Sequence, residues 1–74
     1  MMSFGVDANI LEKALKKGIR VRKGDRFVDA PGYVSLTYIP QYGDFVLAYG
    51  SSSSDAGYVR TNAYGREWEV RDAD

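Results

Sequence analysis

The sequence contains no cysteine and no histidine, and these two absences exclude several classes of site. Without cysteine there are no disulfides or thiolate metal ligands, and without histidine the usual general base and the commonest metal ligand are missing. No apolar run approaches the roughly 18 to 20 residues of a membrane helix, and residues 1–10 lack the basic start and apolar middle of a secretory signal. We therefore expect a cytoplasmic protein with no membrane contact, no metal and no cofactor.

The length of 74 residues, with 45% hydrophobic residues, suits one compact domain but not two. We expect a single domain over residues 1–74. A core of this size contributes only a few kcal/mol of net stability, so an oligomer is one option.

Positive and negative charges cancel in total but not along the chain. The sequence has ten basic and ten acidic residues, yet seven of the ten basic residues lie between Lys13 and Arg26. Nucleic-acid binders generally carry an excess of positive charge and a pI above about 9, whereas the pI here is about 6.2. General nucleic-acid binding is therefore not expected.

Residues 7–17 have the pattern of an amphipathic helix. Four apolar residues recur with helical spacing: Ile10, Leu11, Ala14 and Leu15. Lysines occupy the last turn, where they interact favourably with the negative end of the helix dipole. Asp7 can cap the first turn, although Ser3 could cap an earlier start, and Gly18 ends the helix.

After Gly18 the apolar residues alternate with period two, which predicts β-strands. The strands are expected at residues 19–23, 26–28, 33–39, 44–49, 57–61 and 67–71. Residues 44–49 are apolar on both sides, which indicates a central strand, and the serine-rich residues 50–56 predict a mobile loop. The predicted fold is α+β, with the N-terminal helix packed on a four- to five-stranded antiparallel β-meander.

No arrangement of residues indicates catalysis. The sequence has no GxSxG nucleophile motif, no phosphate-binding GxxxxGK[ST] loop and no carboxylate spacing of a metal loop. Glu67 and Glu69 share a strand face, but carboxylates that flank a buried tryptophan are typical of a solvated edge. We therefore expect a protein that is not an enzyme.

The basic segment 16–26 permits a structural and a functional interpretation. In the structural one, the lysines belong to the helix end and the arginines keep a strand soluble. In the functional one, Arg20, Arg22 and Arg26 converge on one phosphate or carboxylate, because a guanidinium binds such anions through two parallel hydrogen bonds.

Aromatic residues supply the other half of a candidate site. Tyr33, Tyr58 and Phe27, together with Val46, are expected on an exposed sheet face that can serve as an interface. Trp68 either fills the core or stacks on a nucleobase beside an arginine. The candidate ligand-binding residues are Arg20, Arg22, Arg26, Phe27, Tyr33, Tyr58 and Trp68.

Three blocks of the sequence, at residues 14–23, 33–40 and 67–69, carry a family resemblance. They read ALKKGIRVRK, YVSLTYIP and EWE. They resemble the helix end, the basic and aromatic-rich strands and the last strand of small phage and bacterial proteins of the Thoeris anti-defence signal-sponge type. The resemblance implies a non-enzymatic, phage-encoded homo-oligomer in the host cytoplasm. It also implies that the protein sequesters a phosphorylated cyclic nucleotide-like immune signal, with arginine on the phosphate and aromatics on the base.

Two departures from the family pattern allow a different ligand or none. Phe27 stands near the family's tryptophan, and a plain turn at residues 61–65 replaces a small acidic helical turn. The first alternative is a small inhibitor that binds a host defence protein through an exposed strand edge or the aromatic face. The second alternative is a module that binds RNA or single-stranded DNA through the same arginines.

Overall fold

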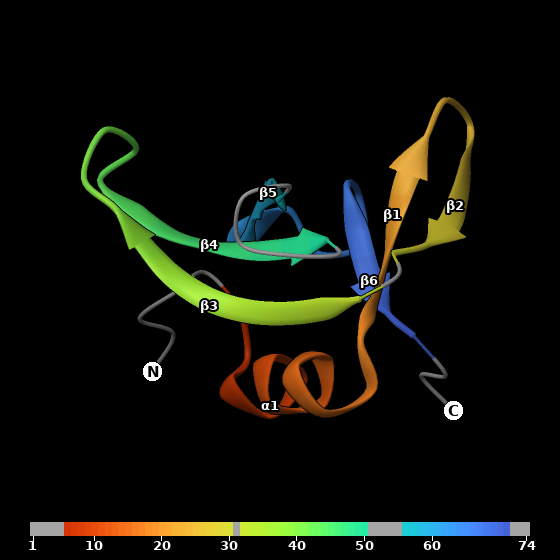
Figure 1. Ribbon diagram of the computed structural model, residues 1–74, viewed down its shortest axis with the longest axis horizontal. Coiled ribbons are helices and arrows are strands. Elements are labelled where there is room, and N and C mark those ends of the chain that lie inside the picture. The colour runs from red at the N-terminus through yellow and green to blue at the C-terminus, as the bar shows by residue number, and fades with distance from the viewer. Residues whose placement is uncertain (1–5, 31, 51–55, 72–74) are drawn as a thin grey trace.

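The computed structural model describes residues 6–30, 32–50 and 56–71, with Tyr33 described by its backbone alone. Within these residues the chain forms one α-helix, six strands and a short 3-10 helix (Figure 1). Their order is α1 (Ala8–Lys17), β1 (Ile19–Lys23), β2 (Arg26–Asp29), β3 (Tyr33–Ile39), β4 (Asp44–Gly50), β5 (Ala56–Arg60), η2 (Thr61–Ala63) and β6 (Trp68–Val70). The α+β class predicted from the sequence is confirmed.

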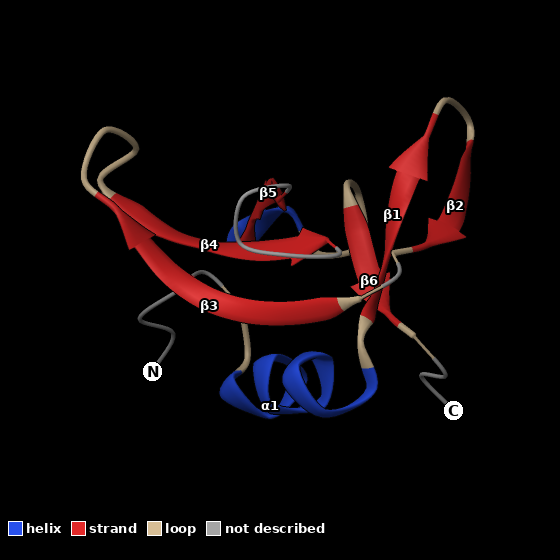
Figure 2. Cartoon of the chain, in the orientation of Figure 1, coloured by secondary structure: helices blue, strands red, loops and turns tan. Residues whose placement is uncertain are grey.

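The strands form two antiparallel sheets of three, in the orders β2-β1-β6 and β3-β4-β5 (Figure 2). The prediction of one four- to five-stranded meander is therefore corrected. β3, β4 and β5 do follow one another as a meander, but β6 returns to pair with β1. Alternation along a strand reports which face is buried and does not report which strand lies beside it.

The helix begins and ends where its capping residues predict. The Asp7 carboxylate accepts a hydrogen bond from the Asn9 backbone N–H at 3.0 Å, so the first turn starts at Ala8. Gly18 follows the last helical residue with φ of 91° and donates its N–H to the Ala14 carbonyl at 2.9 Å. No helix among the described residues is long and apolar enough to cross a membrane.

The core lies between the two sheets and α1. It is formed by ten buried residues contributed by the helix, both sheets and the connecting segments. These residues are Val6, Leu11, Ala14, Ile19, Val21, Ala30, Leu47, Ala63, Trp68 and Val70. Figure 1 shows α1 across one end of the molecule, where it contacts β3 and β6. The helix thereby contacts one strand of each sheet and closes the core on that side.

The central position predicted for residues 44–49 is confirmed. β4 pairs with β3 on one side and β5 on the other, and its three consecutive residues Val46, Leu47 and Ala48 are all buried. Leu47 faces the core between the sheets, whereas Val46 and Ala48 alternate to the outer face. Both faces of this strand are therefore covered, as its uninterrupted apolar sequence requires.

Strand ends differ from the predictions by one residue or so. β2 and β4 each extend one residue further, to Asp29 and Gly50, whereas β6 is shorter than the predicted 67–71. β5 ends at Arg60 because η2 begins at Thr61, whose hydroxyl donates to the Phe45 carbonyl at 3.3 Å. The predicted loop begins and ends with strand residues, and its remaining residues 51–55 lie outside the described part of the chain.

Candidate functional site

Arg20 and Arg22 project from the outer face of the β2-β1-β6 sheet. They alternate along β1 with Ile19 and Val21, which are buried in the core. These two arginines therefore project together from one strand. Their surroundings differ, however, and the difference decides what each can bind.

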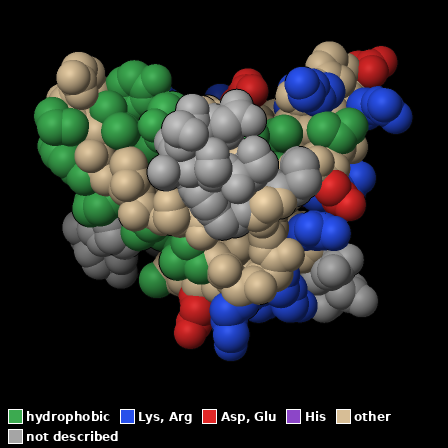
Figure 3. Space-filling model, in the orientation of Figure 1, with side chains coloured by type: hydrophobic (Ala, Val, Ile, Leu, Met, Phe, Trp, Pro, Cys, Tyr) green, Lys and Arg blue, Asp and Glu red, His purple; other side chains and the backbone are tan. Residues whose placement is uncertain are grey.

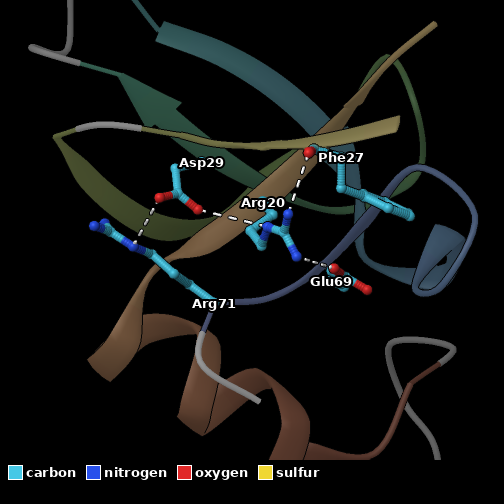
Figure 4. A network of polar contacts seen from close by, with 5 residues as sticks. All are labelled: Arg20, Phe27, Asp29, Glu69 and Arg71. Atoms are coloured by element: carbon cyan, nitrogen blue, oxygen red, sulfur yellow. Dashed lines mark hydrogen bonds and ion pairs between the residues drawn. The ribbon is translucent and has the colours of Figure 1, made fainter. Parts of the chain in front are cut away.

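Arg20 lies at the centre of a network that spans all three strands (Figure 4). In the register it stands opposite Asp29 on β2 and Glu69 on β6. Its Nη1 donates to Glu69 Oε2 at 2.9 Å, its Nη2 donates to the Phe27 carbonyl at 3.2 Å, and its Nε is 3.5 Å from Asp29 Oδ1. All three guanidinium nitrogens thus have partners within the chain.

Arg71 extends this network past Asp29. Its Nε lies 3.6 Å from Asp29 Oδ2, so two arginines alternate with two carboxylates and the formal charges cancel. The side chains are 33% to 58% exposed, and partly exposed pairs of this kind contribute at most about 1 kcal/mol each. For Arg20 the geometry therefore favours a structural role over anion binding. The role differs from the predicted one, because β1 is the central strand and Arg20 joins it to both neighbours rather than keeping an edge soluble.

Arg22 stacks on Phe27. The two residues face each other across β1 and β2, and the Arg22 Cζ lies 4.9 Å from the centre of the Phe27 ring. Arg22 Nε also donates to the Arg66 carbonyl. The ring face of Phe27, which the sequence analysis assigned to a ligand, is thus in contact with Arg22. Arg22 itself is exposed.

Arg26 lies on the opposite face of the same sheet. It pairs with Lys23 across the β1–β2 hairpin, and side chains of successive residues alternate between faces. Arg26 therefore shares its face with Val28, whereas Arg20 and Arg22 share theirs with Phe27. Within one chain the three arginines do not form one pocket.

Trp68 belongs to the core. It is completely buried, and its indole Nε1–H donates to the carbonyls of Arg60 and Thr61 at 3.0 and 3.3 Å. Tyr64 packs edge-on against it, with ring centres 5.0 Å apart. Of the two sequence interpretations of this tryptophan, the geometry supports the core role, because no face of the indole is open to a base.

Three exposed residues form a second surface, on the outer face of the β3-β4-β5 sheet. Tyr58 and Arg60 lie two residues apart on β5, so they share a face. The Arg60 Cζ lies 4.7 Å from the centre of the Tyr42 ring, which comes from the β3–β4 turn. Tyr42 and Tyr58 are 46% and 52% exposed, and Arg60 is exposed as well. We call Tyr42, Tyr58 and Arg60 the Tyr/Arg face.

The sequence indicated only part of this surface. Tyr58 was expected on an exposed face beside Val46, and β5 does place it on the side of the sheet that carries Val46. Val46 itself is completely buried there. Tyr33 occupies the same face by register, although its side chain lies outside the described residues. Arg60 and Tyr42 were missed; the alternation of Tyr58, Val59 and Arg60 was the available signal for the arginine.

Apolar and basic side chains gather on different parts of the molecular surface (Figure 3). In this view hydrophobic side chains gather over the β3–β4 hairpin, at the upper left. Lysine and arginine gather over the β1–β2 hairpin and beside α1. Within the β3–β4 hairpin, Tyr38 is 53% exposed and packs edge-on against Phe45 with ring centres 5.3 Å apart.

Comparisons of the chain with protein-family models, with curated proteins and with solved structures find no match. In the part of the chain that the structure describes, no three acidic side chains gather closely enough to hold a metal ion. The chemistry of the two surfaces is therefore the evidence on the function of this chain.

Proposed function

We propose that the chain is a small, non-enzymatic inhibitor that binds a partner protein through the Tyr/Arg face. The observation that carries this proposal is the exposure of two tyrosines around an arginine that stacks on one of them. Tyrosine and arginine are enriched among the residues that dominate binding energy at protein interfaces. A tyrosine ring covers a large area while losing little conformational freedom, because its side chain has only two χ angles.

The Tyr/Arg face is better suited to bind a partner protein than any exposed strand edge. The outer strand β2 carries two charged residues, Arg26 and Asp29, and the outer strand β5 carries one, Arg60; such charges oppose pairing with a further strand. β6 has only three residues, and α1 contacts the remaining outer strand, β3. A partner that docks side chains on the Tyr/Arg face needs none of these edges.

The proposal predicts that Tyr58→Ser removes capture of the partner. In a lysate of bacterial host cells, the immobilised wild-type chain should retain one stoichiometric protein, and Tyr58→Ser should retain at least about tenfold less of it, as expected for loss of a central anchor. Tyr38→Ser is the matched control, because Tyr38 is equally exposed but its register places it on the other face of the same sheet. Equal capture by Tyr58→Ser and the wild type would contradict the proposal.

The second candidate function is sequestration of a phosphorylated cyclic nucleotide-like signal. The observation that favours it is the Arg22–Phe27 pair, which places a guanidinium and an aromatic ring together on an exposed sheet face. In a nucleotide site, a guanidinium binds the phosphate and an aromatic ring stacks on the base. Because Arg20 is engaged internally and Arg26 faces away, a complete pocket requires a second subunit.

This second function predicts a rise in melting temperature with a nucleotide. A thermal-shift panel of linear and cyclic nucleotides should contain at least one that stabilises the folded chain, because a ligand that binds only the folded state raises its stability. Arg22→Ala should abolish the rise, and Arg26→Ala should preserve it. A flat panel, or an equal rise in the Arg22→Ala variant, rejects sequestration.

A further inference from the structure

The Tyr/Arg face contains a guanidinium whose charge is not neutralised by the described chain. Arg20 and Arg71 are paired with Asp29 and Glu69. Within residues 6–30, 32–50 and 56–71, the Arg60 side chain makes neither a hydrogen bond nor an ion pair, and its one contact of note is the Tyr42 ring. Arg60 is therefore available to an anionic group from outside.

The Tyr42 ring also affects how Arg60 can bind. The Arg60 Cζ lies over this ring, 4.7 Å from its centre, and the contact uses none of the guanidinium N–H groups as hydrogen-bond donors. A carboxylate can then accept two parallel hydrogen bonds from one edge. The nearest acidic residue by register among the described residues, Asp44, forms no ion pair with Arg60, and its Oδ1 accepts the Phe45 backbone N–H at 2.7 Å.

Tyr58 fixes the spacing that a partner must match. It lies two residues before Arg60 on the same strand face, which corresponds to about 7 Å along the strand. An extended peptide places side chains i and i+2 on one side with the same spacing. One such pair can therefore engage the tyrosine and the arginine at once.

We propose that the partner presents an extended acidic segment, with an Asp or Glu on Arg60 and a large apolar side chain two residues away on Tyr58. This inference rests on the proposed function and names the chemistry of its partner. Charge complementarity carries it: the exposed cation of the face has no carboxylate partner among the described residues, and the flanking groups are aromatic.

A peptide selection tests the segment directly. Random unphosphorylated peptides are displayed and selected on four immobilised chains: the wild type, Arg60→Glu, Arg26→Glu and Tyr58→Ser. Arg26→Glu is the matched control, since Arg26 is also exposed but lies in the other sheet. Equal melting temperatures of the four chains establish that each variant is folded.

The wild type and Arg26→Glu should enrich peptides with an Asp or Glu two residues from an aromatic or large aliphatic residue. Arg60→Glu should lose them, and a synthetic peptide of that pattern should bind it at least about tenfold more weakly. Enriched peptides that lack acidic residues, or that bind Arg60→Glu as tightly as the wild type, overturn the inference alone. The absence of any peptide enriched over Tyr58→Ser overturns the proposed function together with it.

Discussion

Replacing Trp68 with alanine is expected to leave most of the chain unfolded at 25 °C. Trp68 is completely buried between the two sheets and fills more of the core than any other fully buried side chain. Truncating a buried tryptophan costs about 3–5 kcal/mol, and a core of this size supplies about the same amount in total. Circular dichroism during thermal and urea unfolding measures the effect.

Trp68→Phe is the matched variant for the same position. It keeps an aromatic ring in the core and removes the N–H that donates to the Arg60 and Thr61 carbonyls. We expect it to fold with a loss of about 1–3 kcal/mol, because the buried Thr61 carbonyl and the partly buried Arg60 carbonyl lose their shared donor. A Trp68→Ala chain as stable as Trp68→Phe would contradict the central place of this residue in the core.

Gly57→Ala is expected to destabilise the chain by about 1–3 kcal/mol, the usual cost of overpacking. Gly57 pairs with Tyr49 across β4 and β5, and a Cβ atom at Gly57 would lie 2.8 Å from Cζ of the Tyr49 ring. Alanine also restricts the unfolded chain, which alone would stabilise by about 0.4–1 kcal/mol. The clash outweighs that gain because Tyr49 packs against the core.

A double-mutant cycle separates these two effects. In a Tyr49→Val background the ring is absent, so the same Gly57→Ala change should be neutral or slightly stabilising. Urea unfolding of the wild type, both single variants and the double variant gives the coupling energy. Equal costs of Gly57→Ala in both backgrounds would show that the ring does not limit this position.

Local rules were enough to predict the α-helix and the strands of this fold, whereas the plain turn predicted at residues 61–65 is wrong, because the 3-10 helix η2 occupies Thr61–Ala63. The Asp7 cap, the lysine-rich last turn and Gly18 predicted the helix, and alternating apolar residues predicted each strand to within about one residue at either end. The assembly of two sheets was not predictable in the same way. The β1–β6 pairing joins Arg20 to Glu69 across 49 positions of sequence, and no local pattern encodes such a partner.

The site was harder to predict than the fold for the same reason. Arg20, Arg22 and Arg26 are close in sequence, but Arg26 follows the hairpin turn. It pairs with Lys23, whose side chain lies on the face opposite to that of Arg20 and Arg22. The partners that occupy Arg20 come from β2 and β6. The Tyr/Arg face joins a turn residue, Tyr42, to a strand that follows it by more than a dozen residues.

Chemical-shift mapping tests the central claim most directly, because it reports which of the two surfaces is used. The isotope-labelled chain is titrated with the selected acidic peptide or with the captured host protein, and backbone amide shifts are followed residue by residue. The account predicts the largest changes at Tyr42, Tyr58 and Arg60, with β1 and β2 little affected. Largest changes at Arg22 and Phe27, with the Tyr/Arg face unmoved, would contradict it.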